Sequence, residues 1–345
     1  MTILVTGGAG MVGSHCAEHF SKKNHQVIVY DNLMRSQIFR SQKESVEYNW
    51  HYLKTLPKII LEKNDIRDRA ALKKCFQQYK PDVVIHAAAQ PGVRFSLDNP
   101  YEDFEINCVG TVNVLEAFRE VNPQGTLIYC STNKVYGENI NNYALVEKKS
   151  RYTFKKEKGV SEKESVDLTG HTPYGTSKLA GEQYVQDYAH TYGLKTGVFR
   201  MSCIYGTRQF GFEDQGWLAW FSICALQNRD VTIYGDGKQV RDVLWVEDLI
   251  RAYEKFINSD SKHEVFNIGG GPENTLSLLE LVAILEEILS KKIKVGFDDW
   301  RKFDQKVYIS NIDKIKREMG WAPEVSVKEG LKRLTHWIKE NPEVF

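Results

Sequence analysis

A glycine-rich turn close to the N-terminus constrains the fold of this chain more than any other feature of its sequence. An apolar run at residues 3–5 leads into Gly7, Gly10 and Gly13, and a helical pattern that includes Phe20 follows. Glycine leaves out the side chain where a backbone must turn sharply or lie against another group. The order of strand, glycine turn and helix therefore predicts the first βα unit of a doubly wound parallel sheet.

The same turn predicts a binding site for a pyrophosphate. The helix that starts at Met11 and Val12 offers free N–H groups and the positive end of its dipole. A second strand, residues 26–30, ends in Asp31 and Asn32, at the distance typical of an acid that binds an adenosine ribose. A carboxylate accepts hydrogen bonds from a ribose diol and repels a 2′-phosphate, which favours NAD over NADP. The alternative, a glycine-rich turn in a domain that binds no nucleotide, has a prior of about one in ten.

Strands and helices alternate through the first half of the chain, which predicts a parallel sheet with helices on both faces. A short strand at residues 58–62 ends near a polar and an apolar residue suited to flank an adenine. A buried strand at residues 82–86 leads into three alanines, which allow a ligand to approach closely, although tight packing would explain them equally well. These further candidate cofactor contacts are Asp65, Ile66, Ala87, Ala88 and Ala89.

Composition limits the partners and the compartment that we expect. The formal net charge of the 345 residues is +1, so nothing indicates nucleic acid or an acidic membrane surface as a partner. The six cysteines form no CxxC pair, and no His/Cys cluster has metal-ligand spacing, so we expect reduced thiols and no metal. The chain starts on a strand and has no apolar run of membrane-spanning length, which favours the cytoplasm and no membrane partner.

The alternating pattern breaks between residues 138 and 170. Six basic residues lie within 148–158, and a solvated surface loop is favoured there at about three to one over a basic lid that covers a phosphorylated substrate. Beyond residue 200 the composition becomes rich in loops. We expect an NAD-binding Rossmann domain over 1–200 and a smaller C-terminal α/β lobe over 201–345 that binds substrate, with a chain that can cross between them.

The segment Tyr174-Gly175-Thr176-Ser177-Lys178 predicts the chemistry. On a helix Tyr174 and Lys178 share one face, and a lysine cation lowers the pKa of a neighbouring phenol. Tyr174 then serves as a general base or acid for an alcohol, and Lys178 can also hold a nicotinamide ribose. Thr132, at the end of a strand, is suited to hold the reacting oxygen. Alone, the pair would be an ordinary surface pair; together with NAD and Thr132 it predicts oxidation of a carbinol and the reverse reaction.

These motifs resemble the extended short-chain dehydrogenase/reductase family of nucleotide-sugar enzymes. The resemblance rests on GGAGMVG, Asp31, STNKVYG around Thr132 and YGTSK around Tyr174, and it covers essentially the whole chain. It implies Thr132, Tyr174 and Lys178 as the catalytic set. It also implies a homodimer or higher homo-oligomer through the helices at 101–120 and 174–192. Asn107 and Arg200 join Tyr174 and Lys178 as candidate cofactor contacts.

Three departures from the family patterns narrow the implied reaction. The 4,6-dehydratases place Asp-Glu after the catalytic threonine, where this chain has Asn133 and Lys134, and 4-epimerases have Asn where it has Cys203. The stretches TRQF and DQGW resemble the branch of CDP-hexose 2-epimerases, of the CDP-paratose and CDP-tyvelose type. The candidate substrate contacts are Thr132, Asn133, Lys134, Cys203, Gln209, Gln215, Gly216, Trp217, Arg241, Arg301 and Asp304.

The resulting hypothesis is an NAD-dependent epimerase that inverts C2 of a CDP-hexose through a transient 2-keto sugar. One alternative is a UDP-hexose 4-epimerase, because the choice of CDP over UDP rests on the resemblance alone. The other is a non-catalytic NAD-binding regulator, which is disfavoured because such a protein needs none of the three predicted catalytic residues and this chain has all of them. The sequence does not distinguish CDP-paratose from CDP-glucose or another CDP-hexose.

Overall fold

The computed structural model describes residues 1–35 and 43–345, without the side chains of 43–46. The chain forms two compact units. Their boundaries differ from the expected division after residue 200 in two segments: residues 136–170 belong to the second unit, and residues 250–266 belong to the first. Unit 1 comprises residues 1–135, 171–200 and 250–266, and unit 2 comprises residues 136–170, 201–249 and 267–345.

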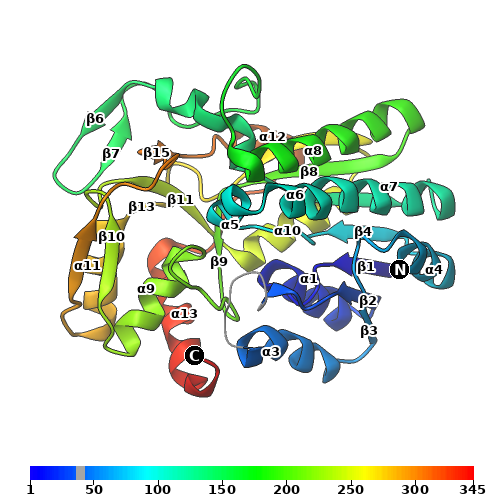
Figure 1. The fold of residues 1–345 in the computed structure, drawn as a ribbon, viewed down its shortest axis with the longest axis horizontal. Coiled ribbons are helices and arrows are strands. Elements are labelled where there is room, and N and C mark those ends of the chain that lie inside the picture. The colour runs from blue at the N-terminus through cyan, green and yellow to red at the C-terminus, as the bar shows by residue number, and fades with distance from the viewer. Residues whose placement is uncertain (36–42) are drawn as a thin grey trace. The chain divides into compact units, whose positions relative to one another are not determined.

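A seven-stranded sheet with the order β12-β8-β5-β4-β1-β2-β3 organises the first unit (Figure 1). Strand β1 pairs in parallel with β2 on one side and with β4 on the other, so the strand order reverses there. Ligands of doubly wound sheets bind at this reversal. The predicted doubly wound α/β fold is thereby confirmed. Its strands are β1 (Thr2–Thr6), β2 (Gln26–Asp31), β3 (Ile59–Lys63), β4 (Val83–His86), β5 (Thr126–Thr132), β8 (Lys195–Met201) and β12 (His263–Ile268).

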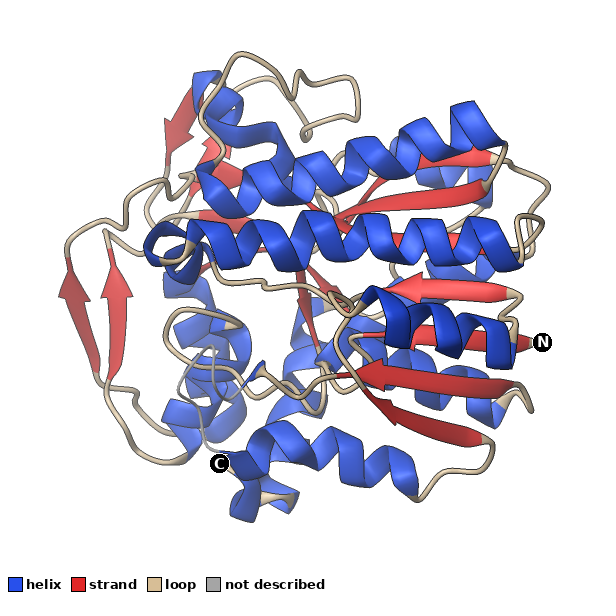
Figure 2. Cartoon of the chain, turned by 45° about the vertical axis from the view of Figure 1, so that its right-hand side comes forward, coloured by secondary structure: helices blue, strands red, loops and turns tan. Residues whose placement is uncertain are grey.

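Helices α7 and α8 lie side by side against the sheet (Figure 2). Their inner faces and those of α4 join the strands in one core, in which Phe76 and Phe118 make an edge-to-face contact. The helices that lie wholly or partly in unit 1 are α1 (Met11–Lys22), α3 (Lys43–Lys54), α4 (Arg69–Tyr79), α5 (Val93–Asp98), α6 (Pro100–Phe104), the π-helix η1 (Glu105–Val109), α7 (Gly110–Val121), α8 (Thr172–Tyr192) and α10 (Val246–Ile257).

Unit 2 is built around strand β11 (Val240–Trp245). This strand pairs with β13 (Thr275–Ser277), β15 (Val307–Tyr308) and β9 (Cys203–Tyr205), and β10 (Val231–Tyr234) pairs in parallel with β14 (Val295–Asp298). A separate core packs these strands against α9, α11 and α13. The remaining elements are η2 (Asn133–Asn142), β6 (Leu145–Glu147), β7 (Tyr152–Phe154), α9 (Trp217–Leu226), α11 (Leu278–Leu289), α12 (Asp313–Met319), α13 (Val327–Glu340) and η3 (Pro342–Val344).

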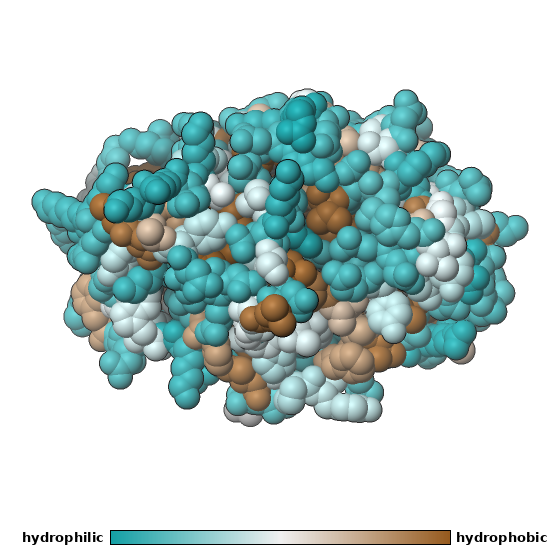
Figure 3. Space-filling view, turned by 90° about the horizontal axis from the view of Figure 1, so that it is seen from above, coloured by the Kyte–Doolittle hydropathy of each residue, from teal (hydrophilic) through white to brown (hydrophobic). Residues whose placement is uncertain are grey.

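The basic stretch at 148–158 comprises the turn of the β6–β7 hairpin, its second strand and the four residues that follow. Its lysines are exposed, as expected for a solvated surface. Arg151 is different, because it is half-buried and pairs with Glu280 at the start of α11. The face drawn in Figure 3 is largely hydrophilic, with apolar side chains interspersed. No helix in the described part of the chain is both long and apolar enough to cross a membrane.

Gly13→Ala should destabilise the protein by about 1–3 kcal/mol, the usual effect of overpacking. An added Cβ would lie 2.3 Å from the carbonyl oxygen of Gly7 and 2.7 Å from the Cα of Gly8. Gly296→Ala is the control, since a Cβ there has no neighbour within 4 Å. Urea unfolding followed by circular dichroism measures both; equal effects of the two substitutions would contradict the close packing of the turn.

Candidate active site

The glycine turn forms a cradle between β1 and α1. Gly7 has a positive φ of 66°, and a Cβ on it would lie 2.5 Å from the backbone nitrogen of Ala88, beyond the end of β4. Gly10 precedes α1 in an extended conformation, and no side chain caps the helix. The N–H groups of the first turn, at Met11 and Val12, therefore remain for a ligand. Such a turn fits the pyrophosphate of a dinucleotide.

The carboxylate of Asp31 lies beside this cradle. It accepts hydrogen bonds from the backbone nitrogens of Ala9, at 3.0 Å, and Leu33, at 2.8 Å. Burial raises the pKa of Asp31, and these two backbone bonds oppose the rise. A fixed carboxylate at the end of β2 fits a ribose diol, so the turn and the acid together suit NAD.

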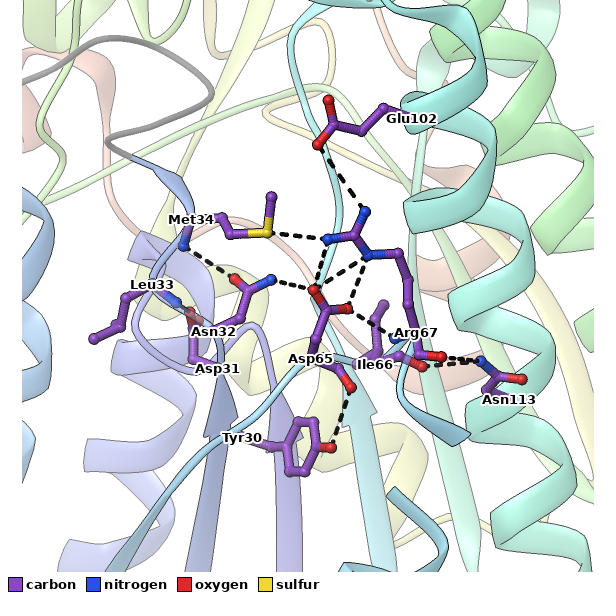
Figure 4. A network of polar contacts seen from close by, with 10 residues as sticks. All are labelled: Tyr30, Asp31, Asn32, Leu33, Met34, Asp65, Ile66, Arg67, Glu102 and Asn113. Carbon is purple, nitrogen blue, oxygen red and sulfur yellow. Dashed lines mark hydrogen bonds and ion pairs between the residues drawn. The ribbon is translucent and has the colours of Figure 1, made fainter. Parts of the chain in front are cut away.

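A network of polar contacts joins the loops after β2 and β3 (Figure 4). Arg67 donates to both oxygens of Asp65, with Nη2 2.7 Å from Oδ2, and Asn32 donates to the same Oδ2 at 2.8 Å. Burial alone would raise the pKa of Asp65, but the bonds from Arg67 and Asn32 outweigh it and lower the pKa. Ile66 is buried, and its carbonyl accepts from Asn113 on α7 at 3.0 Å. These contacts hold the expected adenine-flanking residues in one conformation.

The predicted catalytic residues come together within unit 1. Thr132 ends β5, Tyr174 lies in the first turn of α8, and Lys178 follows one turn later; all three are at most 9% exposed. The side chain of Thr132 is hydrogen-bonded to Tyr174, as expected for a hydroxyl and a phenol that share a reacting oxygen. The set can pass a proton between a bound carbinol and the phenol.

The expected lowering of the Tyr174 pKa is not found in the protein alone. Burial raises it to about 12, and the hydrogen bond from Thr132 only partly offsets this. Burial also lowers the pKa of Lys178, to about 8. The physical reason is desolvation, which disfavours the charged form of both groups and which a sequence does not display.

Asn107 and Arg200 are expected to contact the cofactor, but their side chains bond to other residues of unit 1. The amide of Asn107, in η1, bonds Gln90 at 2.9 Å and Ser177 at 3.0 Å. Arg200, at the end of β8, forms a buried ion pair with Glu182 on α8, with Nη2 2.6 Å from Oε1. Both side chains therefore link α8 to its neighbours.

Sequence reasoning missed Glu182, Asp103 and Gln90 among these linking residues. Glu182 is fully buried and also accepts a hydrogen bond from Ser131, which directly precedes the catalytic threonine. Asp103 on α6 accepts from Gln90 and from Ser177, which lies between Tyr174 and Lys178 in the sequence. The spacing of Glu182, four residues after Lys178 and so on the same helix face, was the available signal.

Asn133 and Lys134 directly follow Thr132, the predicted catalytic threonine. The backbone nitrogen of Lys134 donates to Thr132 Oγ1 at 3.3 Å, and that hydroxyl is 3.5 Å from Asn133 Oδ1. An amide and an ammonium thus occupy the two positions after the threonine, and neither is a carboxylic acid.

Unit 2 contains the remaining candidate substrate contacts. Trp217 donates from its indole nitrogen to Cys203 Sγ at 3.5 Å, and Gly216 precedes α9 with a positive φ of 75°. Gln209 donates from Nε2 to the carbonyl of Ile204 at 3.2 Å, and its buried Oε1 has no hydrogen-bond partner among the described residues. The buried Oε1 of Gln215 also has no hydrogen-bond partner within unit 2 or elsewhere in the described chain.

Both candidate arginines of unit 2 are paired with acids. Arg241 Nη2 lies 2.5 Å from Asp304 Oδ1, which brings together two of the expected residues. Arg301 lies 3.1 Å from Asp214 Oδ1, and its guanidinium carbon is 4.1 Å from the ring centroid of Tyr234. Among the described residues, no group of three or more His, Cys, Asp or Glu side chains could hold a metal ion.

Comparison with known proteins establishes the family of this chain. Residues 3–269 match the NAD dependent epimerase/dehydratase family, and the chain belongs to it. The chain is 41% identical to CDP-paratose 2-epimerase of Salmonella typhi, an alignment that covers 98% of this chain and 99% of the relative. It is 34% identical to a putative UDP-glucose 4-epimerase of Methanocaldococcus jannaschii, with 98% and 99% covered.

Solved structures of the same family have the same fold. UDP-glucose 4-epimerase of Thermotoga maritima, solved with UDP-glucose, matches with a TM-score of 0.82 and 30% identity, covering 99% of this chain and 100% of that chain. UDP-glucuronic acid 4-epimerase of Bacillus cereus, solved with UDP-glucuronic acid and NAD, matches with a TM-score of 0.83 and 27% identity, covering 99% of each chain.

Arg67→Gln should lower stability at neutral pH by on the order of 1 kcal/mol, since Asp65 loses charge-assisted hydrogen bonds. The folded-state pKa of Asp65 is lowered, so its contribution is present above the ordinary carboxyl pKa and is lost as pH falls through the lowered value. In urea unfolding the stability gap to the unmodified protein should therefore be constant near neutral pH and should narrow as pH falls below the ordinary carboxyl pKa of about 3.9. Lys74→Gln, at an exposed lysine of α4, is the control. A gap that stays constant below that pKa would rule out the pairing as its source.

Proposed function

We propose that the protein is an NAD-dependent epimerase that inverts C2 of a CDP-hexose through a 2-keto intermediate. The observation that carries this proposal is the hydrogen bond between Thr132 and Tyr174, with Lys178 one helical turn away. This arrangement serves reversible oxidation of an alcohol. A net epimerisation needs nothing further, because the hydrogen removed from the carbon is returned to its other face.

The acid and base steps fall to three side chains. Thr132 holds the C2 hydroxyl, and Tyr174 as the phenolate removes its proton while the C–H bond breaks. Lys178 stabilises the phenolate by its charge. When bound, NAD supplies the hydride acceptor and donor. In the return step Tyr174 gives the proton back to the alkoxide, so protons and electrons balance over the cycle.

The sugar must turn over between the two steps, so its ring cannot be gripped tightly. We propose that binding is concentrated on the nucleotide and diphosphate, through Arg241 and Arg301, the loop that contains Gln209 and Gln215, and the start of α9 at Trp217. Arginine suits a diphosphate because its planar fork forms two parallel hydrogen bonds. The unpartnered Oε1 atoms of Gln209 and Gln215 can accept from donors on the ligand.

The 41% identity to a CDP-paratose 2-epimerase supports inversion at C2 and a CDP-linked sugar. Asn133 and Lys134, which follow Thr132, argue against a dehydratase. Those two residues supply no carboxylic acid for the elimination of water. The similarity to UDP-glucose and UDP-glucuronic acid 4-epimerases keeps a UDP-hexose 4-epimerase as the second candidate.

We also propose a homodimer, or a higher homo-oligomer, in the cytoplasm. Exposed apolar side chains lie on α6 and η1, where Tyr101 is 74% exposed, and on α8, where Tyr192 is 48% exposed. Such side chains are suited to contact a second copy of the chain. The six cysteines are free, and all except Cys203 are buried, which fits a reducing compartment.

The substrate and the carbon can be tested with a panel of CDP- and UDP-sugars that carry deuterium at C2 or at C4. We expect inversion at C2 of a CDP-sugar with the label retained, because the same hydrogen is removed and returned. Nuclear magnetic resonance of the products reads both the configuration and the label. Inversion at C4 would move the assignment to a 4-epimerase, and no turnover of any sugar would reject both.

Tyr174→Phe should reduce kcat by about 100-fold to 10,000-fold, the usual contribution of a general acid or base, while the protein still binds NAD. Stopped-flow turnover and calorimetric titration with NAD measure the two properties. Tyr79→Phe, on α4, is the matched control and should leave turnover unchanged. Unreduced turnover of Tyr174→Phe would discard the acid–base assignment.

A further inference from the structure

The ammonium of Lys178 lies over the ring of Tyr129, with Nζ 4.2 Å from the ring centroid. Both side chains are buried, at 2% and 0% exposed. A cation over an aromatic face is attracted by the electron-rich ring, and the attraction is larger where water is excluded. Tyr129 lies on β5, three residues before Thr132. The strand that presents the catalytic hydroxyl therefore also presents this ring.

The hydroxyl of the same ring also contacts α8. The hydroxyl of Tyr129 donates to the backbone carbonyl of Lys178 at 3.2 Å. Gly181 makes room for it, since a Cβ at that position would lie 2.6 Å from the tyrosine oxygen.

The charged and titratable groups that face Lys178 come from four elements. The thiol of Cys130 on β5 and the carboxylates of Glu182 on α8 and Asp103 on α6 favour its charged form. His86 on β4 is held neutral, because burial and the nearby lysine lower its pKa to about 3. In the described part of the chain none of these groups forms a hydrogen bond or an ion pair with the ammonium.

The two carboxylates are engaged elsewhere. Glu182 pairs with Arg200, and Asp103 accepts hydrogen bonds from Gln90 and Ser177. A buried ammonium without a bonded acid is costly. The ring of Tyr129 is in direct contact with it.

We propose that Tyr129 is a positioning residue, whose ring holds the Lys178 ammonium charged and in place beside Tyr174. The inference rests on the proposed function, since it assigns the ring to the same acid–base set. The ring acts on Tyr174 only through Lys178 and does not touch the reacting atoms. Its electron-rich face is required, and its hydroxyl is not.

The first test compares Tyr129→Phe with Tyr129→Leu in the NAD-loaded enzyme. For the sugar that the unmodified enzyme turns over, Tyr129→Phe should keep the pH profile of kcat/KM. Tyr129→Leu should move its acidic limb up by about one pH unit, because Tyr174 then ionises beside a lysine that is less charged. Phe118→Leu makes a similar cavity in the same core and should not move the limb. Identical profiles for Tyr129→Leu and Phe118→Leu would overturn the proposal.

A second measurement needs no substrate. Phenolate absorbance of the NAD-loaded protein is titrated against pH, and the curve of the matching Tyr174→Phe protein is subtracted to isolate Tyr174. Tyr129→Leu should shift this titration upward and Tyr129→Phe should not. Tyr129→Met, whose flexible side chain fills the space of the ring, replaces Tyr129→Leu if that variant does not fold. If no sugar is turned over, the proposed function fails, whereas an unshifted titration overturns the role of the ring.

Discussion

The burial of a polar face of α8 is the constraint on which unit 1 depends. Tyr174, Ser177, Lys178 and Glu182 follow each other at helical spacing, so they share the face that packs against the sheet. A helix normally buries apolar side chains on such a face. A buried polar group without a partner destabilises the folded state, so every member of this row must find one in a neighbouring element.

The partners come from different strands and helices, and this is what gives the site its geometry. Glu182 bonds Ser131 on β5 and Arg200 on β8, and Ser177 bonds Asp103 on α6. Each bond satisfies a buried group and at the same time fixes the rotation and the height of α8 relative to the end of β5. The contact between Thr132 and Tyr174 therefore follows from the pairing of residues that take no part in the reaction.

Local patterns predicted the features that depend on short stretches of sequence. The glycine turn and Asp31 were predicted because both signals lie within one βαβ unit. The turn needs close approach of the backbone, and the acid must end the second strand. The pairing of Arg200 with Glu182 was missed, since the choice of partner depends on how a strand and a helix pack. The raised pKa of Tyr174 has the same origin, because desolvation is a property of the packed protein. The placement of residues 136–170 and 250–266 likewise follows from contacts distant in sequence.

The arginines of unit 2 add a constraint on how the proposed substrate can bind. Arg241 is paired with Asp304 and Arg301 with Asp214, so a diphosphate that binds either arginine competes with a carboxylate already in place. The net affinity then comes from the difference between two charge-assisted contacts and not from the whole of one. A nucleotide anchored in this way is held by its diphosphate with moderate strength. That suits a reaction in which the attached sugar must leave one orientation, turn, and be held again in the other.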